Sequence, residues 1–184
     1  GFVPALLFGI AVGNVLLGVP FHLTPDLMPV YEGGLFGKLF GLFRPFALLC
    51  GLVSVAMALM LGAGWLVLKT EGAIQDRARA LGRPAALVVL AGYALAGLWL
   101  AWGIQGYAFV TEPAHDGPSN PLLYQVTRSD SWLIAYAQRP WIAIAPALGF
   151  LGTIMAWRAL GGRGQLSPLG WSQLSVFGMI SSVG

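Results

Sequence analysis

The chain has 184 residues, of which 57% are hydrophobic and only 9% are charged, and its formal net charge is +3. A soluble domain carries about 25% charged residues, and a domain of this size leaves too much of its surface exposed to hide so many apolar side chains. The composition therefore argues against a water-soluble enzyme. It also excludes intrinsic disorder, because disordered chains are poor in apolar residues.

Hydrophobic stretches recur along the chain at the length of about 20 residues that a helix needs to cross a bilayer. They predict an all-α fold, a polytopic transmembrane helix bundle with about four full spans and a truncated fifth. The expected spans are residues 2–19, 46–68, 84–104, 141–160 and 170–184. Both ends lie inside apolar runs, so we interpret 1–184 as a single transmembrane domain fragment from inside a longer protein. A cleaved signal peptide is the rival explanation for the start.

Charged residues lie almost entirely between the expected spans. The connection 69–83 and the connection after Arg158 carry an excess of basic residues, whereas 20–44 and 106–140 are near neutral. Because cytoplasmic loops are enriched in Lys and Arg, we expect 69–83 and 161–169 to be cytoplasmic and the other two loops to lie outside. The basic residues form no stripe with aromatic platforms, so no nucleic-acid partner is expected.

The two long outer loops have patterns of their own. Residues 33–43 (GGLFGKLFGLF) are apolar with one Lys and are expected to lie in the membrane interface. Residues 119–138 begin with Ser119, Asn120 and Pro121, which suit an N-cap and the first helical position. Apolar residues then recur at helical spacing, so we predict a short amphipathic helix on the outer face.

Small residues mark two expected packing faces. Gly9 and Gly13 form a GxxxG spacing in the first span, and the second span places Cys50, Ser54, Ala58 and Gly62 at four-residue steps. In lipid, such faces let helices approach closely. We interpret them as packing faces without chemistry, and the lone Cys50 as a packed thiol.

Few residues are candidates for chemistry. Asn14 is a polar residue within the first span and needs a hydrogen-bond partner there. Ordinary interhelical bonding is one explanation, and a hydrated path or a quinone headgroup pocket is the other, which makes Asn14 the only candidate for cofactor binding. His22 and His115 lie in outer loops and are expected to be solvated, and Thr70, Glu71, Arg77 and Arg79 form a solvated loop or a surface charge cluster. We expect no catalytic residue and no metal site.

Several strings resemble subunit II of cytochrome bd-type quinol oxidases, in the same order along nearly the whole chain. They are residues 9–21 (GIAVGNVLLGVPF), 45–55 (PFALLCGLVSV), 94–97 (ALAG), 103–107 (GIQGY), 119–122 (SNPL), 132–133 (WL) and 146–149 (PALG). The match weakens after about Leu160. Arg44 departs from the neutral residue of some relatives, which leaves the branch of the family open, including the cyanide-insensitive type.

The resemblance implies a non-haem membrane subunit of a terminal oxidase that oxidises quinol and reduces dioxygen to water. Haems b and d and the quinol-oxidising loop belong to the partner, subunit I, and this chain is expected to bind none of them itself. It would support subunit I and shape proton and oxygen access, with membrane lipid and a quinone as further candidate partners. The family's acidic and Trp-Asp motif is absent here, so no proton-delivery residue is carried over.

Two alternatives stay open, a transporter or channel fragment and a structural membrane assembly factor. A proton or ion transporter usually has a buried acid, His or Arg within its spans. The expected spans here contain no Asp, Glu, Lys or His, and Arg158 lies at a span end from which it reaches the interface.

Overall fold

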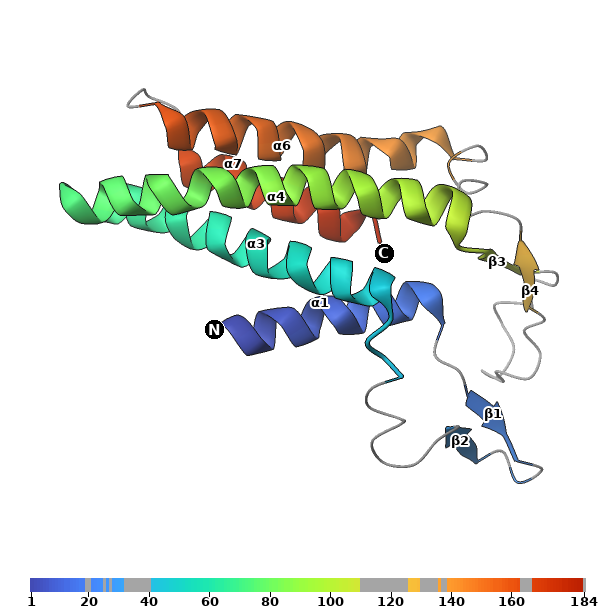
Figure 1. Ribbon diagram of the computed structural model, residues 1–184. Coiled ribbons are helices and arrows are strands. Elements are labelled where there is room, and N and C mark those ends of the chain that lie inside the picture. Colours follow the sequence, from blue (N-terminus) through green and yellow to red (C-terminus); the bar gives the residue numbers. More distant parts are fainter. Residues whose placement is uncertain are drawn as a thin grey trace, which may run out of the picture. The chain divides into compact units, whose positions relative to one another are not determined.

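The computed structural model describes residues 1–18, 21–24, 26, 28–31, 41–109, 126–129, 136, 139–162 and 167–183. They divide into two compact units, Gly1–Ala96 with Ala143–Gly184, and Gly97–Ile142. The described helices are α1 (Phe2–Leu17), α3 (Pro45–Lys69), α4 (Ala73–Gly103), α6 (Ile144–Gly161) and α7 (Pro168–Ser181), with a 3-10 turn η2 (Pro140–Ala143) before α6 (Figure 1). That the whole chain forms one domain stays a prediction.

The predicted transmembrane helix bundle is confirmed. Each expected span coincides with a helix, and three helical segments in the described residues are long and apolar enough to cross a membrane: Pro45–Lys69, Ala73–Gly103 and Pro140–Gly161. The first predicted span is shorter than expected, because α1 has 16 residues and ends at Leu17. Gly18 follows with a φ of 73°, a left-handed conformation that ends the helix and that glycine adopts without strain.

The start of α4 was misplaced by the sequence analysis. The expected span begins at Pro84, where the apolar run begins, but the helix begins eleven residues earlier at Ala73 and contains Pro84. Most of the expected loop 69–83 is therefore helical. Pro84 has no N–H to give to the carbonyl of Ala80, and both residues are exposed at this position. The polar, Ala-rich sequence of 73–83 favours a helix by propensity, although it lacks the hydrophobicity of a span.

Two short antiparallel hairpins occupy parts of the long connections. In the first unit, β1 (Phe21–Leu23) pairs with β2 (Pro29–Tyr31). Two hydrogen bonds between Thr24 and Met28 close the turn. The backbone N–H of Thr24 donates to the carbonyl of Met28 at 3.0 Å, and the backbone N–H of Met28 donates to the side-chain oxygen of Thr24 at 3.1 Å. In the second unit, β3 (Gly106–Phe109) pairs with β4 (Val126–Ser129), with Gly106 opposite Ser129.

The β4 strand corrects the amphipathic helix predicted over 119–138. Val126–Ser129 is extended and hydrogen-bonded to β3, so helical spacing in this segment was a misleading signal. Val, Thr and Ser suit a strand when a partner strand is available. Tyr136 is helical, and the other residues of 119–138 lie outside the described part of the chain, as do residues 33–40 of the segment predicted to lie in the interface.

Within the first unit, consecutive helices pack antiparallel around a shared core. Gly82 and Gly92 of α4 lie against Ala63 and Val53 of α3, in reversed order along the two helices. The largest buried cluster joins α3, α4 and α6 and contains Met60, Ala63, Val67, Ala78, Ala85, Ala86, Ala156 and Leu160. Most of these side chains are small, so the helices are held by close contact rather than by large interlocking side chains.

Candidate functional site

Asn14 lies in α1 and is 4% exposed, with both hydrogens of its amide in use. The side-chain nitrogen donates to the carbonyl of Ile10 in the same helix at 2.9 Å and to the carbonyl of Leu42 at 2.7 Å. Leu42 lies just before α3, so this amide ties the entry of α3 to α1. The Oδ1 atom of Asn14 is buried and accepts no hydrogen bond from any described residue.

Gly9 and Gly13 create the close contact that buries Asn14. A Cβ atom on Gly9 would lie 2.5 Å from the carbonyl oxygen of Cys50, and one on Gly13 would lie 2.7 Å from the Cα of Ala47. Real Cβ atoms do not approach backbone this closely, so any larger residue would push α1 and α3 apart. The packing face predicted from the GxxxG spacing is confirmed.

The predicted small-residue stripe of α3 is used only in part. Cys50 and Ser54 lie against Gly9, whereas Ala58 is exposed and a Cβ on Gly62 would meet nothing within 4 Å. The half-buried Cys50 thus sits at a helix contact, as its small size suggested.

A second close contact joins α6 and α7, and the sequence analysis missed it. Cβ atoms on Gly152 and Gly178 would meet the backbone nitrogens of Ser175 and Gly149. Buried beside them, the hydroxyls of Thr153 and Ser175 share a hydrogen bond of 2.6 Å, and Thr153 also donates to the carbonyl of Gly149 at 2.8 Å. Two three-residue spacings of small residues, Gly149 to Gly152 and Ser175 to Gly178, could have indicated this contact.

A further polar contact holds α7 to α4. The hydroxyls of Tyr93 and Ser182 lie 2.7 Å apart, and the ring of Tyr93 lies 4.9 Å from that of Phe150 on α6. Tyr93 therefore links three helices with one side chain.

For Arg79, the expectation of a solvated loop or a surface charge cluster is corrected. Its Nη1 donates to the carbonyls of Ala159, Leu160 and Gly162, at 3.1 Å and 3.4 Å for the first two. These carbonyls are at the C-terminal end of α6. The last carbonyls of a helix have no N–H donor within the helix, and they carry partial negative charge. Arg79 thus caps α6 from a position about 80 residues away in the chain.

The neighbouring polar residues cap α3 in a similar way. Gln75 donates through its side-chain nitrogen to the carbonyls of Val67 and Thr70, both at 3.0 Å, and the Thr70 hydroxyl donates to the carbonyl of Leu66 at 2.7 Å. Arg79, Gln75 and Thr70 therefore bond carbonyls at the ends of two helices.

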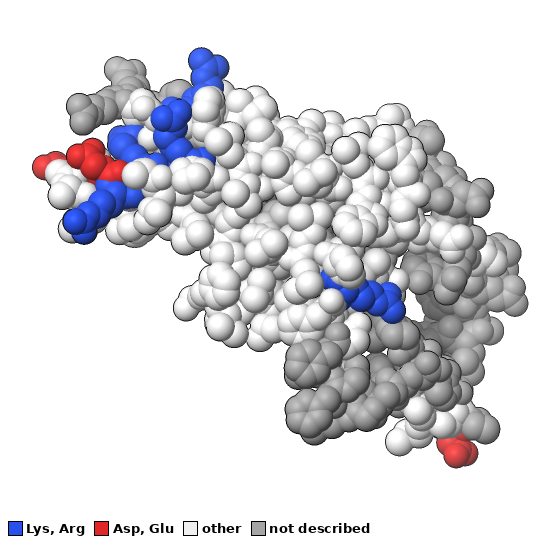
Figure 2. Space-filling model, viewed as in Figure 1, with Lys and Arg blue, Asp and Glu red and all other residues white. Residues whose placement is uncertain are grey.

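The spans offer no cluster for acid–base or metal chemistry in the described residues. No group of three His, Cys, Asp or Glu residues comes together there. His22 lies in β1, and His115 lies outside the described residues. Figure 2 shows a broad uncharged area on this face, with one basic side chain to the right of its centre.

Several side chains of the described spans are of types that can ligate haem iron. Haem iron is held by His, Cys, Met or Tyr, and four such side chains in the described spans take part in packing or hydrogen bonds. Cys50 lies at the α1–α3 contact, Tyr93 is bonded to Ser182, and Met60 and Met179 are buried in hydrophobic clusters.

Known proteins resemble the chain over most of its length. It is 39% identical over 156 residues to "Probable cytochrome oxidase subunit 2" of Haemophilus influenzae, which covers 84% of this chain and 40% of that protein. It is 42% identical over 149 residues to "Cytochrome bd-I ubiquinol oxidase subunit 2" of Escherichia coli K12, which covers 80% of this chain and 38% of that protein.

The aligned part is thus about two-fifths of the length of these curated relatives. The family described as "Cytochrome bd terminal oxidase subunit II" matches residues 1–184. The resemblance found in the sequence strings is confirmed, and with three helical segments able to span a membrane, the chain is part of an integral membrane protein. It belongs to the cytochrome bd terminal oxidase subunit II family.

Proposed function

We propose that this chain forms part of the non-haem membrane subunit of a bd-type terminal oxidase. The complex oxidises quinol and reduces dioxygen to water, and the partner, subunit I, carries haems b and d. The observation that carries the proposal is the family match over residues 1–184. The name of the E. coli relative, a ubiquinol oxidase subunit, supports quinol as the reductant.

The helices supply support and access rather than chemistry. The close contacts of α1 with α3 and of α6 with α7 involve backbone on both sides, which makes these pairs stiff and suits them to hold a partner in place. The apolar parts of the described helices, residues 2–17, 46–68, 84–103, 141–157 and 168–181, carry no Asp, Glu or His. A medium without fixed charges admits apolar dioxygen, and it opposes protons because an isolated charge is costly there. Proton transfer would therefore follow another route.

Asn14 supports this structural role through its two donated hydrogen bonds. With both N–H groups engaged, only Oδ1 is left for a ligand. Oδ1 accepts, so it suits water or the hydroxyl of a quinol, and it does not suit an oxidised quinone, whose oxygens only accept as well. A quinone headgroup at Asn14 would thus be bound in its reduced form alone.

We further propose the sidedness expected from the sequence, in the inner membrane of a bacterium. Residues 69–83 and 161–169 are cytoplasmic, and 20–44 and 106–140 lie outside. The bonds from Arg79 to the end of α6 support a common side for the two basic segments. The bond from Asn14 to Leu42 joins the C-terminal end of α1 to the entry of α3, and these helix ends border the near-neutral connection 20–44. The excess of Lys and Arg then assigns the cytoplasmic side.

One purification tests the function. The full-length gene is expressed with a tag in membranes, and the purified protein is examined by reduced-minus-oxidised spectra and by subunit stoichiometry. A haem-bearing partner at fixed stoichiometry, with quinol-dependent oxygen uptake, is the expected result. Colourless protein with ion or substrate flux in liposomes would indicate a transporter, and a partner that co-purifies only transiently would indicate an assembly factor.

A further inference from the structure

Two arginines border one patch of α6 at the basic end of the helices. The guanidinium of Arg83, on α4, lies over the ring of Trp157 on α6, with 5.1 Å from Cζ to the ring centroid. The same guanidinium faces Gly161, where a Cβ atom would lie 2.9 Å from Cζ. Arg158 is three residues before Gly161, and residues three apart on a helix are surface neighbours. We call Arg83, Trp157, Arg158 and Gly161 the α4–α6 basic patch.

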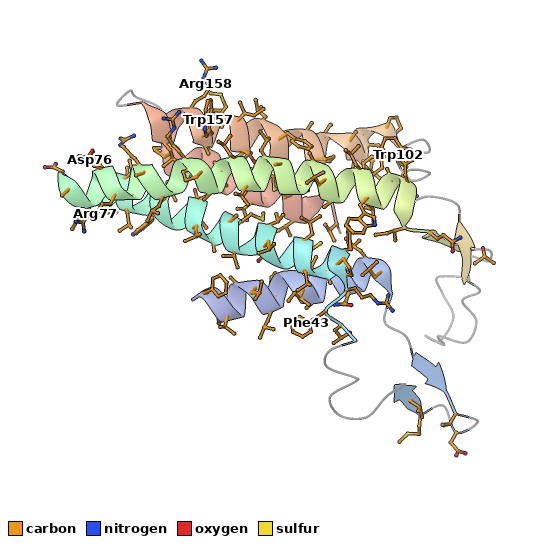
Figure 3. The ribbon with its side chains drawn as sticks, viewed as in Figure 1. Phe43, Asp76, Arg77, Trp102, Trp157 and Arg158 are labelled. Carbon is orange, nitrogen blue, oxygen red and sulfur yellow. The ribbon has the colours of Figure 1, made fainter. Side chains whose placement is uncertain are left out.

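The two guanidinium groups of this patch are available for a ligand. Among the described residues, neither Arg83 nor Arg158 has a hydrogen bond or an ion pair, and both side chains are exposed. Arg79 differs, because it already donates to the last carbonyls of α6 and so neutralises that helix end. Figure 3 shows Arg158 projecting away from the helices beside Trp157.

The surrounding charge at this end is positive. The described residues here carry five cations, Lys69, Arg77, Arg79, Arg83 and Arg158, against Glu71 and Asp76. In Figure 2, most of the visible basic side chains, with acidic ones beside them, gather at one end, and a broad uncharged surface lies beyond them. An anion is therefore favoured over a neutral or cationic ligand.

The patch lies at the level of the lipid headgroups. At 1.5 Å per residue, the 31 residues of α4 extend about 46 Å, which exceeds the hydrocarbon thickness of about 30 Å by roughly ten residues. The polar residues 73–82 account for this excess, and Arg83 is the last residue before the apolar part. Trp157 and Trp65, with Lys69 lying 5.5 Å from the Trp65 ring, mark the same level, because Trp favours the interface.

Exposed apolar side chains continue from the patch toward the middle of the spans. Leu87 lies one turn after Arg83 on α4, and Ile154 lies one turn before Arg158 on α6, with Leu151 a further turn along. They are 48%, 42% and 48% exposed. A phosphate at the two arginines would therefore have an apolar surface beside it for acyl chains. Inorganic phosphate would gain nothing from that surface.

We propose that the α4–α6 basic patch binds the phosphate of an anionic phospholipid. Arg83 and Arg158 hold the headgroup from two sides, Trp157 keeps Arg83 in place, and Leu87, Ile154 and Leu151 contact the acyl chains. Juxtamembrane Lys and Arg attract anionic lipid, and basic pockets between helices bind such headgroups. This binding goes beyond the proposed oxidase function and is independent of it.

The test uses the full-length protein in detergent micelles, in whatever assembly it purifies. Its thermal stability is titrated with phosphatidylglycerol, with phosphatidylcholine and with inorganic phosphate, because a ligand that binds the folded state raises the melting temperature with its concentration. Phosphatidylglycerol is expected to stabilise the protein, whereas phosphatidylcholine and inorganic phosphate have little effect at the same concentrations.

Matched variants locate the binding. Arg83→Gln and Arg158→Gln should each weaken the apparent affinity for phosphatidylglycerol about fivefold. Arg77→Gln, at the same end but pointing away from Trp157 in Figure 3, should leave the affinity unchanged. If Arg83→Gln fails to fold, Arg158→Gln decides alone, because its exposed side chain has no hydrogen bond or ion pair with a described residue. Wild-type affinity in Arg158→Gln, equal losses in Arg77→Gln, or equal stabilisation by inorganic phosphate would overturn the proposal.

Discussion

Thr153 on α6 and Ser175 on α7 share a buried hydrogen bond of 2.6 Å between their hydroxyl oxygens, and both residues are 0% exposed. The bond lies where Gly152 brings the backbones of the two helices together. A glycine that allows close approach and a hydrogen-bonding hydroxyl pair thus occur at the same point. In lipid there is no hydrophobic driving force between helices, so close packing and such hydrogen bonds hold them together.

Removal of either hydroxyl should loosen α6 from α7. Thr153→Val and Ser175→Ala are each expected to destabilise the protein by about 0.5–1.5 kcal/mol, because each leaves the other hydroxyl without this partner. The double variant should cost less than the sum of the two. Unfolding in mixed micelles measures this, with Ser181→Ala, at an exposed position of α7, as the neutral control. Strict additivity would contradict a direct bond.

Gly152 and Gly62 form a matched pair of glycines within spans. Gly152→Ala should destabilise by about 1–3 kcal/mol, because its Cβ would meet the backbone nitrogen of Ser175 and backbone cannot move aside cheaply. Gly62→Ala should be neutral or stabilising, since nothing lies within 4 Å and alanine favours a helix. The free energy of unfolding in mixed micelles decides, and equal effects at both positions would be inconsistent with the α6–α7 contact.

Asn14→Leu should lower stability and yield of the assembled protein, because the carbonyl of Leu42 loses its donor in a partly buried place. The expected cost is about 1–2 kcal/mol. Gln173→Leu is the control, since it removes an amide from an exposed position of α7. Measurements of assembly and turnover in the full-length protein test the role, and wild-type values for Asn14→Leu would refute it.

Arg79→Gln should fray the C-terminal end of α6. A charge at a partly buried helix terminus contributes up to about 2 kcal/mol, and a guanidinium reaches several carbonyls together. Limited proteolysis should therefore cut faster near Gly162. Arg77→Gln removes the same charge from an exposed side chain and should leave cleavage unchanged, so faster cleavage in both variants would argue for a general charge effect.

Sequence patterns predicted the parts of the site that depend on local composition. Asn14 was recognisable as a candidate because an amide within an apolar span needs a hydrogen-bond partner. Gly9 and Gly13 were recognisable as a packing face because their spacing places both on one side of the helix. The acceptor at Leu42 was not predictable, since a backbone carbonyl 28 residues away carries no signal of its own. Arg79 escaped for the same reason, as its partners are carbonyls at the end of another helix.

The position of β4 illustrates the converse error. The sequence of residues 126–129 is compatible with a helix and with a strand. The segment is a strand because β3 is available to pair with it. A strand needs a partner for its backbone groups, and the partner lies outside the local window.

By itself, the sequence determined that the chain enters a membrane, where the apolar part of each helix lies, and which connections are basic, because these follow from hydrophobicity and charge summed over about 20 residues. Only the tertiary structure decided which small residues are contacts and which face open space, as with Gly152 and Gly62. It also decided which cations cap a helix and which remain available, as with Arg79 and Arg158. Both distinctions depend on distances between elements that are remote in the chain, and composition averages do not contain those distances.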